Sequence, residues 1–215
     1  MIRQFSDNTA LVVIDVQEGV NNLQHWGGRT GRRNNPAAER NIAAILDAWR
    51  KAALPVYFTA HDSLELTSPL RLSLDSGRFM RGFEPAPGET VIEKHANSAF
   101  VGTNLEFSLT RRRIHRLLFV GFFTNICVET SVRMSNNLGY ETYLAHDACA
   151  TTNRFGHDGT DYDPETIHAL SLANQIGEFA TGITAENACA LTRTDAPALE
   201  RRQGNEYPGK DNARA

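Results

Sequence analysis

Short apolar runs alternate along this chain with segments in which apolar residues recur every three or four positions. The runs are continuous and rich in β-branched residues, which is typical of strands buried on both faces of a sheet. They predict strands at 9–14, 55–60, 90–93, 116–120, 141–145 and 182–184. The periodic segments predict helices after Asn35-Pro36, Thr103, Cys127 and Asp163-Pro164. This alternation predicts one α/β domain with a mostly parallel, six-stranded sheet and helices on both faces.

Capping signals precede three of the predicted helices. Asn35-Pro36 and Asp163-Pro164 each place a capping side chain before a proline at the first helical position. Thr103 and Glu106 have the spacing of a capping box. The stretches without periodicity predict loops, at 17–34, 63–88 and 151–162. Loops of this length are usually functional or mobile, so Trp26 and its neighbours His25 and Arg32 are expected to line a substrate mouth or to contact another subunit.

Three chemically distinct residues follow three of the predicted strands. In the Rossmann-like strand order 3-2-1-4-5-6, the first and fourth strands are neighbours, and a crevice opens outside their carboxyl ends. Asp15 ends the first strand, Lys94 ends the third, and Cys127 lies just after the fourth, where the chain turns from Gly121 to Asn125 into a helix. We therefore expect these three side chains to converge above one edge of the sheet.

This set of residues suits acyl transfer. A cysteine in the first helical turn faces free backbone N–H groups and the positive end of the helix dipole, which favour the thiolate. Lys94 supplies a positive charge, Asp15 takes the thiol proton, and the backbone N–H of Cys127 faces a developing oxyanion. These groups predict a thioester intermediate with water as the final acceptor. The alternative for Cys127 is a small buried hydrophobic residue, as most free cysteines are.

Composition narrows the class of protein. The 215 residues are 41% hydrophobic and 22% charged, a composition that is ordinary for a soluble globular chain. The formal net charge of −3 gives no reason to expect nucleic acid or a membrane surface as a partner. No 18-residue apolar stretch or signal-peptide pattern is present, and the three cysteines lack metal-ligand spacing, so a cytoplasmic location is expected. Polar residues dominate after the helical segments, which predicts a domain at 1–190 and a polar tail or arm at 191–215.

The segments TALVVIDVQEGV, VIEKHANSAFVGTNLE and GFFTNICVETSVRMSNNLGYETYLAHDACAT resemble the three motif blocks of the isochorismatase-like cysteine hydrolases, in the same order and spacing. The resemblance implies Asp15, Lys94 and Cys127 as a catalytic triad. It also implies a cis peptide bond between Phe122 and Phe123, with the N–H groups of Phe123 and Cys127 forming an oxyanion hole. Members are commonly dimers or tetramers, so a homo-oligomer is expected.

Departures from the family pattern favour one subgroup. Nicotinamidases bind a metal through an aspartate and several histidines after the second strand, whereas this chain has His61 and Asp62 but no second histidine before His95. No metal and no cofactor are therefore predicted. Isochorismatases that cleave a vinyl ether generally lack the cysteine. The expected reaction is hydrolysis of a C–N bond in a small amide, carbamoyl or ureido compound.

Two alternatives stay open. One is a vinyl-ether hydrolase with Asp15 as the acid, and the other is a non-catalytic binding protein on the same fold. Residues near the expected crevice are candidates for substrate binding, namely Gln17, Asn97, Phe100, Phe122 and Phe155. Core packing is the alternative for each aromatic residue. Cys149, Cys189 and the pair His146-Asp147 are expected to have no catalytic role.

Overall fold

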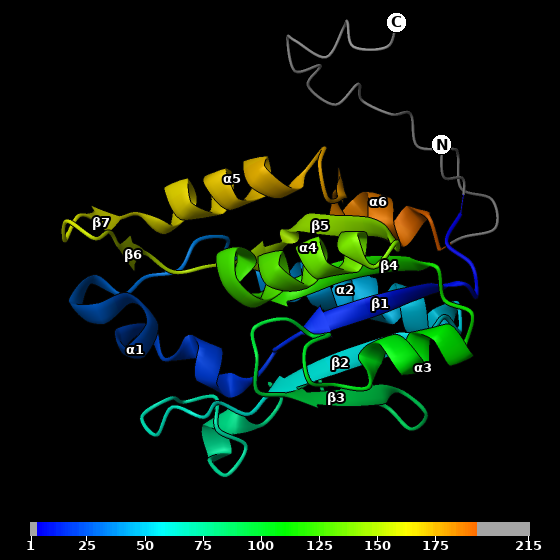
Figure 1. Ribbon diagram of the computed structural model, residues 1–215, viewed down its shortest axis with the longest axis horizontal. Coiled ribbons are helices and arrows are strands. Elements are labelled where there is room, and N and C mark those ends of the chain that lie inside the picture. The colour runs from blue at the N-terminus through cyan, green and yellow to red at the C-terminus, as the bar shows by residue number, and fades with distance from the viewer. Residues whose placement is uncertain (1–3, 193–215) are drawn as a thin grey trace, which may run out of the picture.

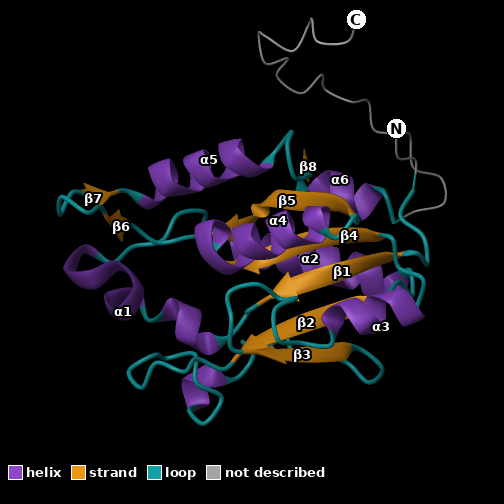
Figure 2. Ribbon diagram, in the orientation of Figure 1, coloured by secondary structure: helices purple, strands orange, loops and turns teal. Residues whose placement is uncertain are grey.

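A parallel sheet organises the protein, and the computed structural model describes residues 4–192 (Figure 1). Its six strands lie in the order β3-β2-β1-β4-β5-β8, and every neighbouring pair is parallel (Figure 2). They are β1 (Thr9–Ile14), β2 (Val56–His61), β3 (Thr90–Lys94), β4 (Arg116–Phe122), β5 (Glu141–Ala150) and β8 (Thr181–Ile183). The predicted order is confirmed. The sixth strand of the sheet is β8 because β6 (Arg154–Phe155) and β7 (Asp161–Tyr162) pair separately as a small antiparallel ribbon.

Helices cover both faces of the sheet, and alternate residues of each strand divide into two cores. Along β1, Leu11 and Val13 pack with Trp49 of the helix α2 (Ala38–Lys51), and α6 (Ala185–Ala190) lies on the same face. Val12 and Ile14 point to the opposite face, where the helices are α3 (Leu105–Arg111), α4 (Glu129–Asn137) and α5 (Pro164–Gln175). Because both faces are covered, all six residues of β1 are buried, as its unbroken apolar run predicts.

Two of the predicted helix starts differ from the structure. Asn35 has a φ of 45°, and its amide donates to the carbonyl oxygens of Asp147 and Cys149, so α2 begins at Ala38 without a side-chain cap. Thr103 donates to Ala99 O and accepts from the N–H of Leu105, the first residue of α3, at 3.3 Å, so it does not form the capping box that its spacing with Glu106 predicts. By contrast, the predicted cap of α5 is confirmed.

The predicted loop at 17–34 is partly helical. It contains a 3-10 turn η1 (Glu18–Asn21), the short helix α1 (Leu23–Gly27) and a second turn η2 (Gly28–Thr30). A third such turn, η3 (Asp75–Gly77), lies in the otherwise irregular segment 63–88. Most of the predicted tail, residues 193–215, lies outside the described residues. Within residues 4–192, none of the helices has the length and apolar character that a membrane crossing requires.

Strands β4 and β5 run further than their predicted ends at 120 and 145, to Phe122 and Ala150. β4 continues through Gly121 to Phe122, so Gly121 lies in the sheet and not in the turn that was predicted there. Its φ is 122°, and a Cβ atom at this position would overlap the carbonyl group of Ile14 on β1. Only glycine therefore allows β4 to approach β1 this closely, one residue before Asp15.

Candidate active site

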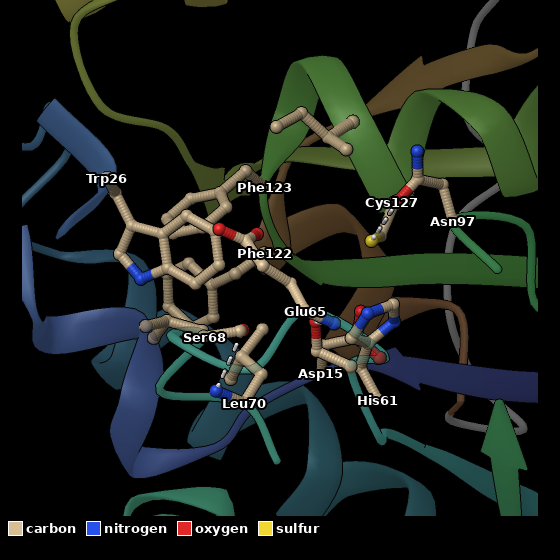
Figure 3. A pocket seen from close by; sticks show the side chains of 13 residues that line it. Asp15, Trp26, His61, Glu65, Ser68, Leu70, Asn97, Phe122, Phe123 and Cys127 are labelled. Carbon is tan, nitrogen blue, oxygen red and sulfur yellow. Dashed lines mark hydrogen bonds between the residues drawn. The ribbon is translucent and has the colours of Figure 1, made fainter. Parts of the chain in front are cut away.

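Four side chains meet at the carboxyl ends of neighbouring strands. Figure 3 shows three of them, Asp15, His61 and Cys127. Asp15 follows β1 in a left-handed conformation with a φ of 49°, His61 ends β2, and Lys94 ends β3. Cys127 lies in a π-helical turn, η4 (Thr124–Val128), which joins β4 to α4. Because parallel strands bring their carboxyl ends to one edge of the sheet, residues far apart in the sequence become neighbours.

The Lys94 ammonium is the centre of this cluster. Its Nζ lies 2.8 Å from Asp15 Oδ2, 3.0 Å from His61 Nδ1 and 3.4 Å from Cys127 Sγ. It also donates to the carbonyl oxygens of Ala96 and Asn97, at 3.1 and 3.3 Å. The lysine side chain is fully buried. The three residues singled out in the sequence therefore lie together, with Lys94 between the carboxylate and the sulfur.

Asp15 is fixed by a second residue that sequence reasoning missed. Thr59 on β2 donates its hydroxyl to Asp15 Oδ1 at 2.5 Å, and the same hydroxyl oxygen accepts from the Asp15 backbone N–H at 3.0 Å. Both carboxylate oxygens are thus engaged, one by Thr59 and the other by Lys94. A buried threonine in an otherwise apolar strand was the only sequence signal for this role.

Burial sets the resting protonation of the cluster. Desolvation, and then the negative charge of Asp15, raise the pKa of the Cys127 thiol far above its ordinary range, although Lys94 opposes this. Lys94, which was expected to favour the thiolate, is thus outweighed by burial and by the Asp15 charge. Burial also opposes the charge on Lys94, but Asp15 and Cys127 outweigh it and raise the pKa of the ammonium. The site at rest therefore holds a neutral thiol beside a charged lysine.

His61 was weighed from the sequence only as a metal ligand. Burial and the nearby Lys94 charge lower the pKa of its imidazole, so the ring is neutral at neutral pH. Because an ammonium has only donors, His61 Nδ1 accepts from Lys94, and the ring proton is on Nε2. Its position at the end of the strand next to β1 was the signal that could have found this contact.

The cluster also resembles a metal site. Ligand atoms of Asp15, His61 and Cys127 all lie within 4.8 Å of one another. However, the Lys94 ammonium contacts each of these three side chains, and so a cation already occupies the space between them. The donor set does not fit a metal ion while Lys94 stays charged.

A cavity of about 200 Å³ opens beside the cluster. One part of its lining consists of Asp15, His61, Asn97 and Cys127. The segment after β2 contributes Ser63, Glu65, Ser68 and Leu70, and the other apolar side chains are Val20, Trp26, Phe122, Phe123 and Ile126. Trp26 donates its indole N–H to Gly19 O at 2.8 Å, and its ring lies 5.1 Å from that of Phe123. Asn97 Oδ1 lies 3.8 Å from the sulfur of Cys127.

The predicted binding residues divide into two groups. Asn97 and Phe122 line the cavity, whereas Gln17, Phe100 and Phe155 do not. Gln17 is buried and clamps the backbone of His61, accepting from its N–H at 2.8 Å and donating to its carbonyl at 3.2 Å. Phe100 packs in the core beside Tyr140, and Phe155 is 56% exposed on β6. These three residues therefore lie outside the cavity, and a role for them in substrate binding stays a prediction.

The backbone before Cys127 has the predicted cis peptide bond, between Phe122 and Phe123. Phe123 lies between β4 and η4, and its carbonyl accepts from the N–H groups of Ile126 and Val128 at 3.0 and 3.3 Å. In residues 4–192, by contrast, no backbone acceptor pairs with the N–H of Phe123.

Comparisons with known proteins agree with this fold. A family model described as the isochorismatase domain matches residues 9–185. The isochorismatase family protein YrdC of Bacillus subtilis is 37% identical over 180 residues, which cover 84% of this chain and 94% of that protein. A crystal structure of an isochorismatase-family protein from Chromobacterium violaceum is also 37% identical, with a TM-score of 0.81, and the match covers 89% of this chain and 97% of the other.

A more distant relative is named for its activity. Nicotinamidase 3 of Arabidopsis thaliana is 28% identical over 165 residues, which cover 70% of this chain and 77% of that protein. The chain belongs to the isochorismatase-like hydrolase family, as its three motif blocks indicate.

Proposed function

We propose that this protein hydrolyses the C–N bond of a small amide, carbamoyl or ureido compound, with Cys127 as the nucleophile. The observation that carries the proposal is the buried Lys94 ammonium, which contacts both the Asp15 carboxylate and the Cys127 sulfur beside a cavity. The cavity volume of about 200 Å³ favours a small substrate, since typical ligand pockets measure roughly 300–1,000 Å³.

The first half of the reaction forms a thioester. Because the resting thiol is neutral, its proton moves to Asp15 as the sulfur attacks the substrate carbonyl carbon. Lys94, 3.4 Å from the sulfur, stabilises the negative charge during this transfer. The tetrahedral intermediate then breaks its C–N bond, and the nitrogen leaves as ammonia or an amine after taking the proton from Asp15. A thioester on Cys127 remains.

The second half releases the acid. Asp15, again ionised, takes a proton from a water molecule that attacks the thioester carbonyl. The C–S bond breaks, the proton returns to sulfur, and a carboxylic or carbamic acid leaves the cavity. In both halves the backbone N–H groups of Phe123 and Cys127 are proposed to hold the oxyanion, a contribution that typically amounts to about 3–4 kcal/mol of transition-state stabilisation per donor. The unpaired N–H of Phe123 supports this role.

Ammonia release from a panel of small amides and ureas, run with and without a chelator, tests the proposal. The wild type should release ammonia in both conditions. Cys127→Ser should lose turnover by several orders of magnitude and keep its unfolding midpoint, whereas the matched control Cys189→Ser, outside the cavity, should keep full activity. Retention of most activity in Cys127→Ser would exclude the thioester route. Turnover of a vinyl ether without ammonia would instead support the second reaction of the family.

A further inference from the structure

One wall of the cavity carries a carboxylate that the proposed mechanism does not use. Glu65 lines the cavity, and its side chain extends toward the rings of Phe122 and Phe123 (Figure 3). It lies in the segment between β2 and β3, which the sequence predicts only as an irregular stretch. Its flanking residues Leu64 and Leu66 are 78% and 79% exposed, and Glu65 is itself exposed, so it lies where the cavity meets solvent.

Hydrogen bonds hold this carboxylate in place. The Thr67 hydroxyl donates to Glu65 Oε1 at 2.9 Å, and the Glu65 backbone N–H donates to Ser63 Oγ at 3.3 Å. A turn closed by the Ser68 N–H on Glu65 O, at 3.1 Å, fixes the backbone. Among residues 4–192, no lysine or arginine forms an ion pair with Glu65. Oxygen Oε2 is therefore available to a ligand.

The charge of the cavity wall depends on this residue. The other lining carboxylate, Asp15, is neutralised by Lys94 at 2.8 Å, and His61 is uncharged at neutral pH. Glu65 thus supplies the net charge of the lining, and it is negative. Beside it stand the aromatic side chains of Trp26 and Phe123, whose ring faces attract cations.

The guanidinium of Arg154 carries a positive charge near the cavity wall, which opposes the negative charge of Glu65. Arg154 lies 5.5 Å from the centre of the Phe123 ring and donates to Trp26 O at 2.8 Å. It does not line the cavity, and it contacts the cavity wall through the Phe123 ring and the Trp26 carbonyl. A carboxylate on the substrate would face Glu65 directly and Arg154 only at a distance.

We propose that Glu65 is a specificity-determining residue and that the substrate carries a cationic group, an ammonium or guanidinium, away from its scissile C–N bond. The substrate class rests on the proposed function, whereas the preference of the cavity for cations does not. The aromatic side chains of Trp26 and Phe123 surround the carbon skeleton of that group, and Glu65 pairs with its charge. Amides that bear a carboxylate at the same place are poor substrates.

Charged thiol reagents test the preference of the cavity without requiring turnover. Cys127 is modified with the trimethylammonioethyl and the sulfonatoethyl methanethiosulfonates, and peptide mass spectrometry follows the rate at Cys127 alone. Each rate is divided by that of the same reagent with 2-mercaptoethanol. The protein variants are the wild type, Glu65→Gln, and the control Glu186→Gln, which removes the same charge from an exposed position on α6.

The cationic reagent should react faster in the wild type. Glu65→Gln should reduce the ratio of cationic to anionic rates by about fivefold or more, the effect of one nearby unit charge in a water-exposed site, while Glu186→Gln leaves the ratio unchanged. A wild-type ratio at or below one, or equal ratios in the two variants, would overturn the proposal. Parallel ammonia assays on 4-aminobutanamide, pentanamide and succinamate separate the two proposals. Hydrolysis without cation preference contradicts only the specificity, and a cation-selective cavity without Cys127-dependent hydrolysis contradicts only the proposed reaction.

Discussion

Replacing Asp15 with asparagine should separate the reactivity of the Cys127 thiol from catalysis. In the wild type, burial and the Asp15 charge together raise the pKa of the thiol. Asparagine removes the charge, and the Lys94 ammonium 3.4 Å from the sulfur is then unopposed. The variant should therefore hold more thiolate than the wild type at any given pH. It should nevertheless turn over far more slowly, because the residue that accepts the thiol proton and returns it to the leaving nitrogen is lost.

The size of this effect follows from the geometry. The Cys127 sulfur and a carboxylate oxygen of Asp15 lie within 4.8 Å of each other. With an effective dielectric constant of about 20, two unit charges at that separation interact by roughly 3 kcal/mol. This energy corresponds to about two pH units. The midpoint for thiol ionisation should fall by about that amount, while turnover falls by about 10²–10⁴-fold, the usual contribution of a general base.

The assay measures the rate at which iodoacetamide alkylates Cys127 across the neutral and alkaline range, with ammonia release measured in parallel. Asp47→Asn, the same change at an exposed position of α2, serves as the control and should leave both quantities unchanged. An alkylation midpoint in Asp15→Asn that stays in place or rises would refute the electrostatic reasoning. Turnover near the wild-type level would refute the assignment of Asp15 as the base.

Three further outcomes are expected. Gly121→Ala should lower the free energy of unfolding by roughly 3 kcal/mol or more in urea denaturation, because its Cβ meets the β1 backbone. Gly139→Ala, which also has a positive φ but open space around the new Cβ, should cost about 1 kcal/mol. Lys94→Met should cost about 3–5 kcal/mol by leaving the Asp15 charge unpaired, and adding Asp15→Asn should restore most of the loss. Burial, and then the nearby His146, lower the pKa of His168 in the folded state. As the pH drops below about 6.5, the unfolded chain binds the proton first, so the stability of the folded state falls. His168→Gln should therefore show a smaller decrease in Tm over that range.

Much of the fold could be predicted because strands that are buried on both faces of a sheet are continuous apolar runs in the sequence. The run TALVVI has no polar alternation, and each of its residues is buried. The convergence of Asp15, Lys94 and Cys127 then followed from one topological rule, that ligands gather outside the carboxyl ends of parallel strands at the switch point. The strand order itself rested on a likeness to known folds, since the periodicity of a strand does not specify its neighbours.

What could not be predicted depends on contacts between distant segments. The protonation state of the Cys127 thiol depends on how deeply the side chain is buried, and the helix-dipole argument takes no account of burial. Gln17 and His61 both lie near strand ends, so the sequence does not distinguish them as cavity residues. In the structure His61 lines the cavity, whereas Gln17 is hydrogen-bonded to the His61 backbone. Glu65 lies in a stretch without periodicity, so no pattern indicates which way its side chain points. The homo-oligomer, the cytoplasmic location and the absence of metal, cofactor and nucleic-acid partners stay predictions.

The most direct measurement of the central claim is peptide mass spectrometry of the protein after acid quenching during turnover of an amide that releases ammonia. A thioester intermediate predicts that the acyl group of the substrate is found on the peptide containing Cys127, that it is absent from Cys149 and Cys189, and that it disappears once the substrate is exhausted. Steady ammonia release with Cys127 unmodified at every time point, together with full activity in Cys127→Ser, would contradict the account.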